Sequence, residues 1–190
     1  MTEQPELHTA HLVLRPIRPD DAADLWPHVS DPATCRWMSW QPHTHIDETS
    51  ALVQRLADDA ARGAGFSWKL MHEGTTCGLI SLIAILHRHR SLTYDRAELA
   101  YWLGSAWRGR GLMTEAGRAV IDHAFGALGI HRLVVGHFAV NDDSRRLIER
   151  LGFRCIGIER DAFMKDGVRH AMKSYDLLAT DPRPHGQAAR

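Results

Sequence analysis

The stretch Tyr101–Ala116 reads YWLGSAWRGRGLMTEA and passes from a strand pattern through a glycine-rich turn into a helix pattern. Apolar and aromatic residues before Gly104 favour a strand, and from Met113 onward apolar residues recur at helical spacing. Gly109 and Gly111 let the backbone approach a ligand without interference from a Cβ atom. The first N–H groups of a helix are unsatisfied and lie at the positive end of its dipole, so this turn suits a phosphate or pyrophosphate.

Two arginines in the same turn, Arg108 and Arg110, add permanent positive charge. Each charge-assisted hydrogen bond to a phosphate is worth about 1.5 to 3 kcal/mol. A Walker loop is excluded because the chain contains no Gly-Lys pair. A dinucleotide fingerprint is disfavoured because Thr114 stands at the position of the third glycine. An ordinary solvated arginine-rich turn remains the alternative.

The patterns on either side of this turn predict one α+β domain. We expect strands over 7–18, 66–72, 77–87, 94–103, 131–139, 153–158 and 171–178, and helices after Pro19, over 47–63, from Met113 and over 141–151. This order implies a mixed sheet with helices on its faces. We expect a single domain over 1–179 and a flexible tail over 180–190.

Composition narrows the class of protein. The chain of 190 residues is 44% hydrophobic and 24% charged, as soluble globular proteins are. Lys and Arg number 23, as do Asp and Glu, so no global positive field recruits nucleic acid or an anionic membrane. Three scattered cysteines and an N-terminus without a signal-peptide pattern indicate a cytoplasmic protein without a disulfide framework.

Several separated motifs resemble the GNAT N-acetyltransferase superfamily, especially its RimJ/RimL-like branch of ribosomal-protein N-terminal acetyltransferases. Residues 98–103 followed by 107–111 are similar to the family's fourth strand and its [QR]-x-x-G-x-[GA] pyrophosphate loop. Met113 departs from the usual final Gly or Ala, which is tolerable if its side chain points into the core. Residues 141–144 and 147–153 are similar to the family's helix near pantetheine and the acyl group.

The resemblance implies a mostly antiparallel sheet of about seven strands with helices on both faces. It also implies a V-shaped gap between the fourth and fifth strands, where acetyl-CoA binds as a cosubstrate. The residues expected to bind it are Tyr101, Trp102, Leu103, Arg108, Gly109, Arg110, Gly111, Met113, Thr114 and Asn141. For Asn141, a helix N-cap role alone is the alternative.

Two residues are candidates for proton transfer. The resemblance places Glu98 beside the amine site as a general base acting through water, and the alternative is a surface carboxylate paired with Arg96 or with a cross-strand cation. Strict alternation puts Glu98 opposite Tyr101, although a bulge could change which side chains share the cleft. The resemblance places Ser144 near the thioester sulfur as a proton donor to the leaving thiolate, and a local first-turn hydrogen bond is the alternative.

The resemblance implies that the acceptor binds on the side of Trp37 and Trp40, two aromatic residues before the second helix, with a satellite core cluster as the alternative. We expect no metal, because neither pair of histidines has the further ligands of a zinc site. The chain is thus expected to move acetyl from acetyl-CoA to a primary amine by direct attack, on a protein N-terminus or a small molecule. The rival is a non-catalytic acyl-CoA-binding or regulatory domain, and a homodimer is kept open.

Overall fold

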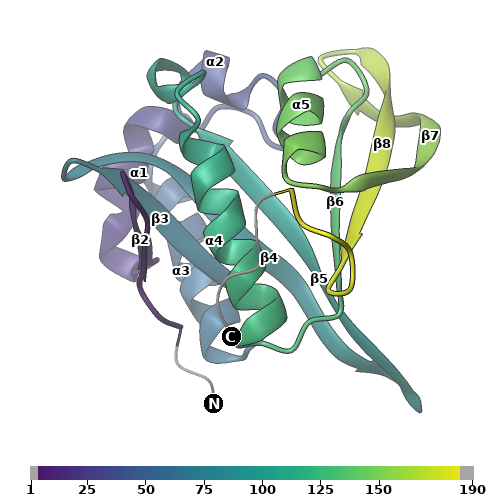
Figure 1. The fold of residues 1–190 in the computed structure, drawn as a ribbon. Coiled ribbons are helices and arrows are strands. Elements are labelled where there is room, and N and C mark those ends of the chain that lie inside the picture. The colour runs from purple at the N-terminus through teal and green to yellow at the C-terminus, as the bar shows by residue number, and fades with distance from the viewer. Residues whose placement is uncertain (1–3, 185–190) are drawn as a thin grey trace.

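A computed structural model describes residues 4–184 of the chain. These residues form one eight-stranded sheet in the order β1-β2-β3-β4-β5-β6-β8-β7 (Figure 1). The strands are β1 (Leu7–His8), β2 (Val13–Pro16), β3 (Phe66–His72), β4 (Thr75–His89), β5 (Leu92–Leu103), β6 (Arg132–Phe138), β7 (Arg154–Lys165) and β8 (Val168–Leu178). Neighbouring strands run antiparallel except for β5 and β6, which are parallel. The expected mixed, mostly antiparallel sheet is confirmed.

Helices cover both faces of this sheet, as expected. They are η1 (Pro19–Asp21), α1 (Ala22–Val29), α2 (Pro32–Cys35), α3 (Ile46–Ala61), η2 (Ser105–Trp107), α4 (Leu112–Gly126) and α5 (Asp142–Arg150). Helix α4 crosses the face nearer the viewer in Figure 1, whereas α1 and α3 lie behind the sheet. The first turn of α4, α2 and α5 gather at one end of the molecule.

The strand count is eight and not about seven, because the predicted N-terminal strand is two strands. The Thr9 backbone N–H donates to the Leu12 carbonyl at 3.0 Å, and the Leu12 N–H donates to the Thr9 hydroxyl at 3.0 Å. This turn splits the expected strand over 7–18 into the hairpin β1–β2. The strands expected to be fourth and fifth are therefore β5 and β6.

Two hydrophobic clusters, one on each face, hold the helices to the sheet. Leu79 and Trp102 are cross-strand partners that pack against α1 and α3. Ile80 and Tyr101, the next pair, face the cluster that contains α4 and α5. Side chains on β5 thus alternate between two separate cores. The alternation decides which candidate residues can meet.

A buried ion cluster lies under α1. The Lys69 ammonium, almost fully buried, donates to Asp21 at 2.6 Å and also contacts Asp24, and Arg15 also bonds to Asp21. Burial alone raises the pKa of Asp21, but hydrogen bonds from Lys69, the Arg18 backbone and Arg15 outweigh it and lower the pKa below its usual value. The cluster fixes the start of α1 against β3.

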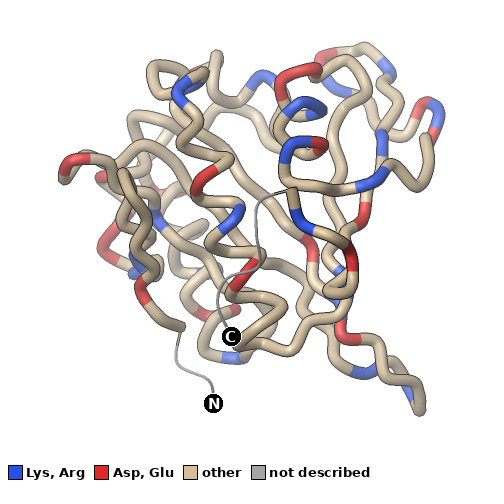
Figure 2. Tube along the Cα trace, in the orientation of Figure 1, with Lys and Arg blue, Asp and Glu red and all other residues tan. Residues whose placement is uncertain are grey.

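Charges of both signs are scattered along the chain (Figure 2). In residues 4–184 no helix is long and apolar enough to cross a membrane. Part of the tail expected to be flexible makes contacts: Asp181 pairs with Arg154 at 3.2 Å, and Arg183 bonds to Asp122 on α4. Residues 185–190 of that tail lie outside the described residues.

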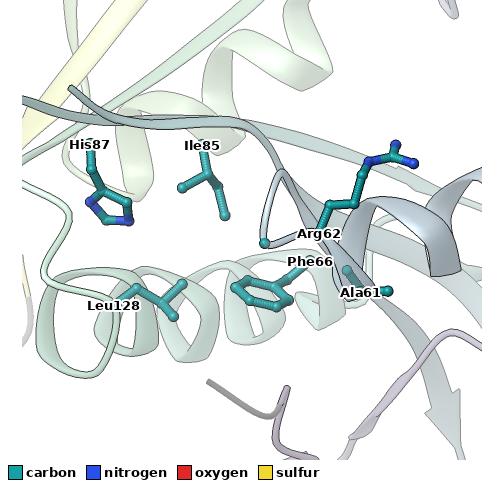
Figure 3. A pocket seen from close by; sticks show the side chains of 8 residues that line it. Ala61, Arg62, Phe66, Ile85, His87 and Leu128 are labelled. Atoms are coloured by element: carbon teal, nitrogen blue, oxygen red, sulfur yellow. The ribbon is translucent and has the colours of Figure 1, made fainter. Parts of the chain in front are cut away.

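A small hollow of about 270 Å³ lies between the end of α3 and the loop after α4. Phe66, Ile85 and Leu128 form its apolar wall, with Arg62 and His87 beside them (Figure 3). It lies at the C-terminal end of α4, whereas the glycine turn lies at the N-terminal end. The hollow is therefore separate from the candidate site.

Candidate functional site

Strands β5 and β6 are joined over only three residue pairs. The pairs are Arg96 with Arg132, Ala97 with Leu133, and Glu98 with Val134. Beyond them β5 stays paired with β4 as far as Leu103, and β6 stays paired with β8 as far as Phe138. The two strands therefore part after Glu98, and within residues 4–184 no backbone hydrogen bond joins their facing edges beyond that point, so these edges can bond a ligand. This is the expected V-shaped gap.

The glycine turn lies beside the wide end of the gap and opens α4. Gly109 and Gly111 have φ values of 76° and 80°, which side chains with a Cβ atom rarely adopt. Gly111 is the N-cap, and the first backbone bond of the helix runs from the Glu115 N–H to the Gly111 carbonyl at 3.1 Å. The N–H groups of residues 112–114 therefore have no acceptor within the helix. This turn can hold an anion.

The two arginines of the turn have different surroundings. Arg110 is exposed, and its guanidinium lies 5.0 Å from the centre of the Trp107 ring. Arg108 donates to the carbonyls of Ala33 and Thr34 in α2, at 3.0 and 3.4 Å. Arg110 therefore keeps its charge accessible to solvent, whereas Arg108 links the turn to α2.

Tyr101 and Ser144 come together on the α4/α5 side of the gap. Their hydroxyl oxygens lie 2.7 Å apart. Burial raises the pKa of Tyr101 to about 12, although the bond to Ser144 opposes the rise, so the phenol is protonated at neutral pH. Tyr101 can then donate to Ser144 and leave the serine hydroxyl hydrogen free for a ligand. Asn141 caps α5 by accepting from the Ser144 backbone N–H at 3.2 Å.

Glu98 lies on the opposite face of β5. The β4–β5 register is unbroken from Glu98 to Leu103, and its shifts fall beyond Ile83, so no bulge alters the alternation here. Glu98 therefore shares a face with Trp102 and points away from Tyr101. It is half-buried and forms no ion pair among the described residues, while the Arg96 guanidinium lies 6.0 Å from the Tyr94 ring. The structure thus gives Glu98 no partner within residues 4–184.

Several expected cofactor residues have side chains in the cores. Trp102 is 5% exposed and packs in the α1/α3 cluster, with its ring 5.9 Å from that of His28. Met113 is 6% exposed and lies in the other cluster, as its position on the apolar helix face predicts. Thr114 is buried and Leu103 is half-buried. Trp102, Met113 and Thr114 can therefore reach a ligand chiefly through main-chain groups.

The two acceptor candidates differ in their surroundings. The centre of the Trp37 ring lies 5.9 Å from the ring centre of Phe138, at the end of β6, and 5.9 Å from that of His170, on β8. Trp40 packs against the α1/α3 cluster, and its indole N–H is buried without a hydrogen-bond partner among the described residues. Trp37 is thus placed at the gap, whereas Trp40 contributes to a core.

Three residues near the gap were not anticipated: Phe138, His170 and Lys165. Lys165, at the end of β7, donates to the carbonyls of Met38 and Trp40 at 2.8 and 3.0 Å. No local motif marks these side chains, because their contacts with residues 37–40 join segments more than 100 residues apart. Only the packing of β8 between β6 and β7 brings them to Trp37.

The chain matches known proteins along most of its length. Residues 11–154 match the family model described as "Acetyltransferase (GNAT) domain". YdaF of Bacillus subtilis (strain 168) is 27% identical over 172 residues, which cover 88% of this chain and 91% of that protein. The [ribosomal protein uS5]-alanine N-acetyltransferase of Escherichia coli (strain K12) is 27% identical over 176 residues, which cover 85% of this chain and 84% of that protein.

The fold is also similar to a solved structure with a bound coenzyme. RimL, described as a ribosomal L7/L12 alpha-N-protein acetyltransferase in complex with coenzyme A, superposes with a TM-score of 0.82. The match covers 90% of this chain and 95% of that chain, at 22% sequence identity. The likeness therefore concerns the whole architecture of the sheet and its helices.

Proposed function

Because the chain belongs to the acetyltransferase (GNAT) domain family, we propose that it transfers acetyl from acetyl-CoA to the α-amine of a protein N-terminus by direct attack. The observation that carries the proposal is the gap between β5 and β6, with the glycine turn beside it. The gap has one face toward α4 and α5 and the other toward α1 and α3. Two substrates can therefore meet in it from opposite sides.

Residues of the turn bind the cosubstrate in this proposal. The N–H groups of residues 112–114 and the Arg110 guanidinium hold the pyrophosphate. The free edge of β5 beyond Glu98 bonds the pantetheine arm through its main chain, which brings the thioester to Tyr101 and Ser144. Side chains buried in the cores, such as Trp102, keep these backbone groups in place.

Glu98 and Ser144 handle the protons. The amine nitrogen attacks the thioester carbonyl carbon, and the carbon–sulfur bond breaks. Glu98 accepts the proton lost by the amine through a water molecule, while Ser144 donates a proton to the departing thiolate and is resupplied by Tyr101 or solvent. A thiol has a pKa of about 8.5, so the leaving group needs little help, and positioning supplies much of the rate.

The nature of the base supports an α-amine acceptor. An α-amine with a pKa of about 7.7 to 8 is roughly 10 to 20% neutral at pH 7, whereas a lysine amine with a pKa of about 10.4 is almost entirely charged. One half-buried carboxylate acting through water suffices for the first. Relatives named for ribosomal-protein acetylation, at an alanine in one case, add support.

Three amines offered with acetyl-CoA test the proposal. The first is a peptide with a free N-terminus and no lysine, the second is the same peptide with a blocked N-terminus and one lysine, and the third is a polyamine. We expect thiol release and a mass gain of one acetyl group only with the first. Acetylation confined to the lysine or the polyamine refutes the α-amine assignment. Coenzyme A binding without turnover on a broad amine panel favours the non-catalytic alternative.

A further inference from the structure

A short segment, residues 31–42, crosses the wide end of the gap from β5 to β6. Its first end is tied to the chain that follows β5. The Ser105 backbone N–H donates to the Thr34 hydroxyl at 3.2 Å, and Arg108 donates to the Ala33 carbonyl at 3.0 Å. This end of the segment is therefore anchored beside the glycine turn.

The second end of the segment is tied to the turn between β7 and β8. The Lys165 ammonium donates to the Met38 carbonyl at 2.8 Å and to the Trp40 carbonyl at 3.0 Å. The Gln41 side-chain amide donates to the Asp166 carboxylate at 2.9 Å. Two segments more than 120 residues apart are thereby joined by three hydrogen bonds.

Between these two anchors stands Trp37, against the end of β6. Its ring lies 5.9 Å from Phe138, where β6 ends, and 5.9 Å from His170 on β8. Residues 31–42 thus bridge the separated ends of β5 and β6, at Leu103 and Phe138. The gap is bounded by paired strands at its narrow end and by this bridge at its wide end.

The chemistry of Lys165 suits it to holding a backbone. Among residues 4–184 it has no carboxylate within ion-pair distance, so its charge is directed to main-chain carbonyls. The ammonium offers three donors, and two of them are used here. It is half-buried, and hydrogen bonds of a charged donor are stronger than neutral ones. A neutral side chain of the same length would leave both carbonyls without this donor.

We propose that Lys165 is a positioning residue that sets the entrance for the acceptor amine, an inference that rests on the proposed acetyl transfer. By holding the main chain at Met38 and Trp40, Lys165 fixes the ring of Trp37 between them and the end of β6. The bridge then forms the wall along which the acceptor reaches the gap. The glycine turn lies at the other anchor, so the cosubstrate site does not depend on Lys165.

Lys165→Met tests the inference, with Lys165→Arg as the conservative variant and Arg169→Met as the matched control. Arg169 is an exposed cation on the same hairpin, and among residues 4–184 its side chain donates only to the Asp161 carbonyl, at 3.3 Å, within that hairpin. Because Lys165→Met removes both hydrogen bonds to the bridge, we expect it to raise the acceptor KM about tenfold and to leave kcat and the acetyl-CoA KM within about twofold of the wild-type values. Lys165→Arg should recover most of the loss, and Arg169→Met should show none.

Hydrogen exchange provides a readout that does not require activity. The Met38 and His43 N–H groups donate to the carbonyls of Cys35 and Val29, both at 3.0 Å, so their protection reports on the bridge. We expect faster exchange in peptides covering 36–43 for Lys165→Met and unchanged exchange for Arg169→Met. Faster exchange with an unchanged acceptor KM overturns the inference and leaves the acetyl transfer standing. Unchanged exchange overturns it as well.

Discussion

Replacing Gly111 by alanine tests whether the glycine turn binds the cosubstrate. The φ value at Gly111 is 80°, and a Cβ atom built there meets nothing within 4 Å. The substitution therefore introduces no collision, and its direct cost is the strain of a left-handed residue, about 1 to 2 kcal/mol. If the backbone rotates to relieve that strain, the N–H groups of residues 112–114 turn away from the anion. Losing one charge-assisted bond weakens coenzyme A binding by roughly tenfold to a hundredfold.

Gly63→Ala is the matched control for this experiment. Gly63 has a φ value of 67°, a Cβ atom there also meets nothing within 4 Å, and the residue lies after α3, away from the gap. Both variants should lose similar stability, with a fall in Tm of about 2 to 4 °C per kcal/mol. Calorimetric titration with coenzyme A should then separate them. An affinity for Gly111→Ala within about twofold of Gly63→Ala would refute the assignment of the turn.

Three further predictions concern protons and charge. Glu98→Gln should lower kcat for an α-amine by about tenfold to a hundredfold, with part of the loss recovered at high pH; superimposable kcat profiles from about pH 6 to about pH 9.5 would remove Glu98 from the mechanism. Tyr101→Phe should lower kcat severalfold in the wild-type background and have no added effect on Ser144→Ala, in a double-mutant cycle; additive losses would show independent roles. Asp21→Asn should lower the free energy of unfolding, measured by urea denaturation, by about 3 kcal/mol, because Lys69 loses a buried charged partner. The pKa of Asp21 is lowered in the folded state, so its carboxylate stabilises the fold fully above the unfolded pKa of 3.8. This stabilisation is lost as the pH falls from there through the folded pKa. The free energy of unfolding of Asp21→Asn should therefore depend less on pH in acid.

Local rules in the sequence are sufficient to predict the glycine turn, the alternation along β5 and the cap of α5. A left-handed φ favours glycine, so the closely spaced Gly109 and Gly111 already indicate a turn in the sequence. Alternation along a strand decides that Glu98 and Tyr101 face opposite ways, once the register is known to be unbroken. The cap formed by Asn141 follows from its position before an apolar helix pattern.

The surroundings of the two acceptor candidates follow from packing between distant segments, and no local rule predicts them. Helix α2 has only four residues, too few for a periodic pattern, and it depends on Asp31 bonding to the N–H groups of Ala33 and Thr34. The sequence around Trp37 and Trp40 does not distinguish their roles. In the structure Trp37 contacts Phe138 at the end of β6, whereas Trp40 packs against the α1/α3 cluster. Similarly, Lys165 reaches the carbonyls of Met38 and Trp40 only because the fold places the β7–β8 turn beside them.

The three residue pairs that join β5 to β6 place stability and activity in conflict. Each additional backbone hydrogen bond between these strands would add about 0.5 to 1.5 kcal/mol to folding. Every such bond would also occupy the main-chain groups that the proposed site offers to its ligand. Selection for thermal stability alone would therefore tend to extend the pairing of β5 with β6 beyond Glu98 and to close the gap. Variants recovered from such a selection should be checked for this closure before any loss of activity is traced to a side chain.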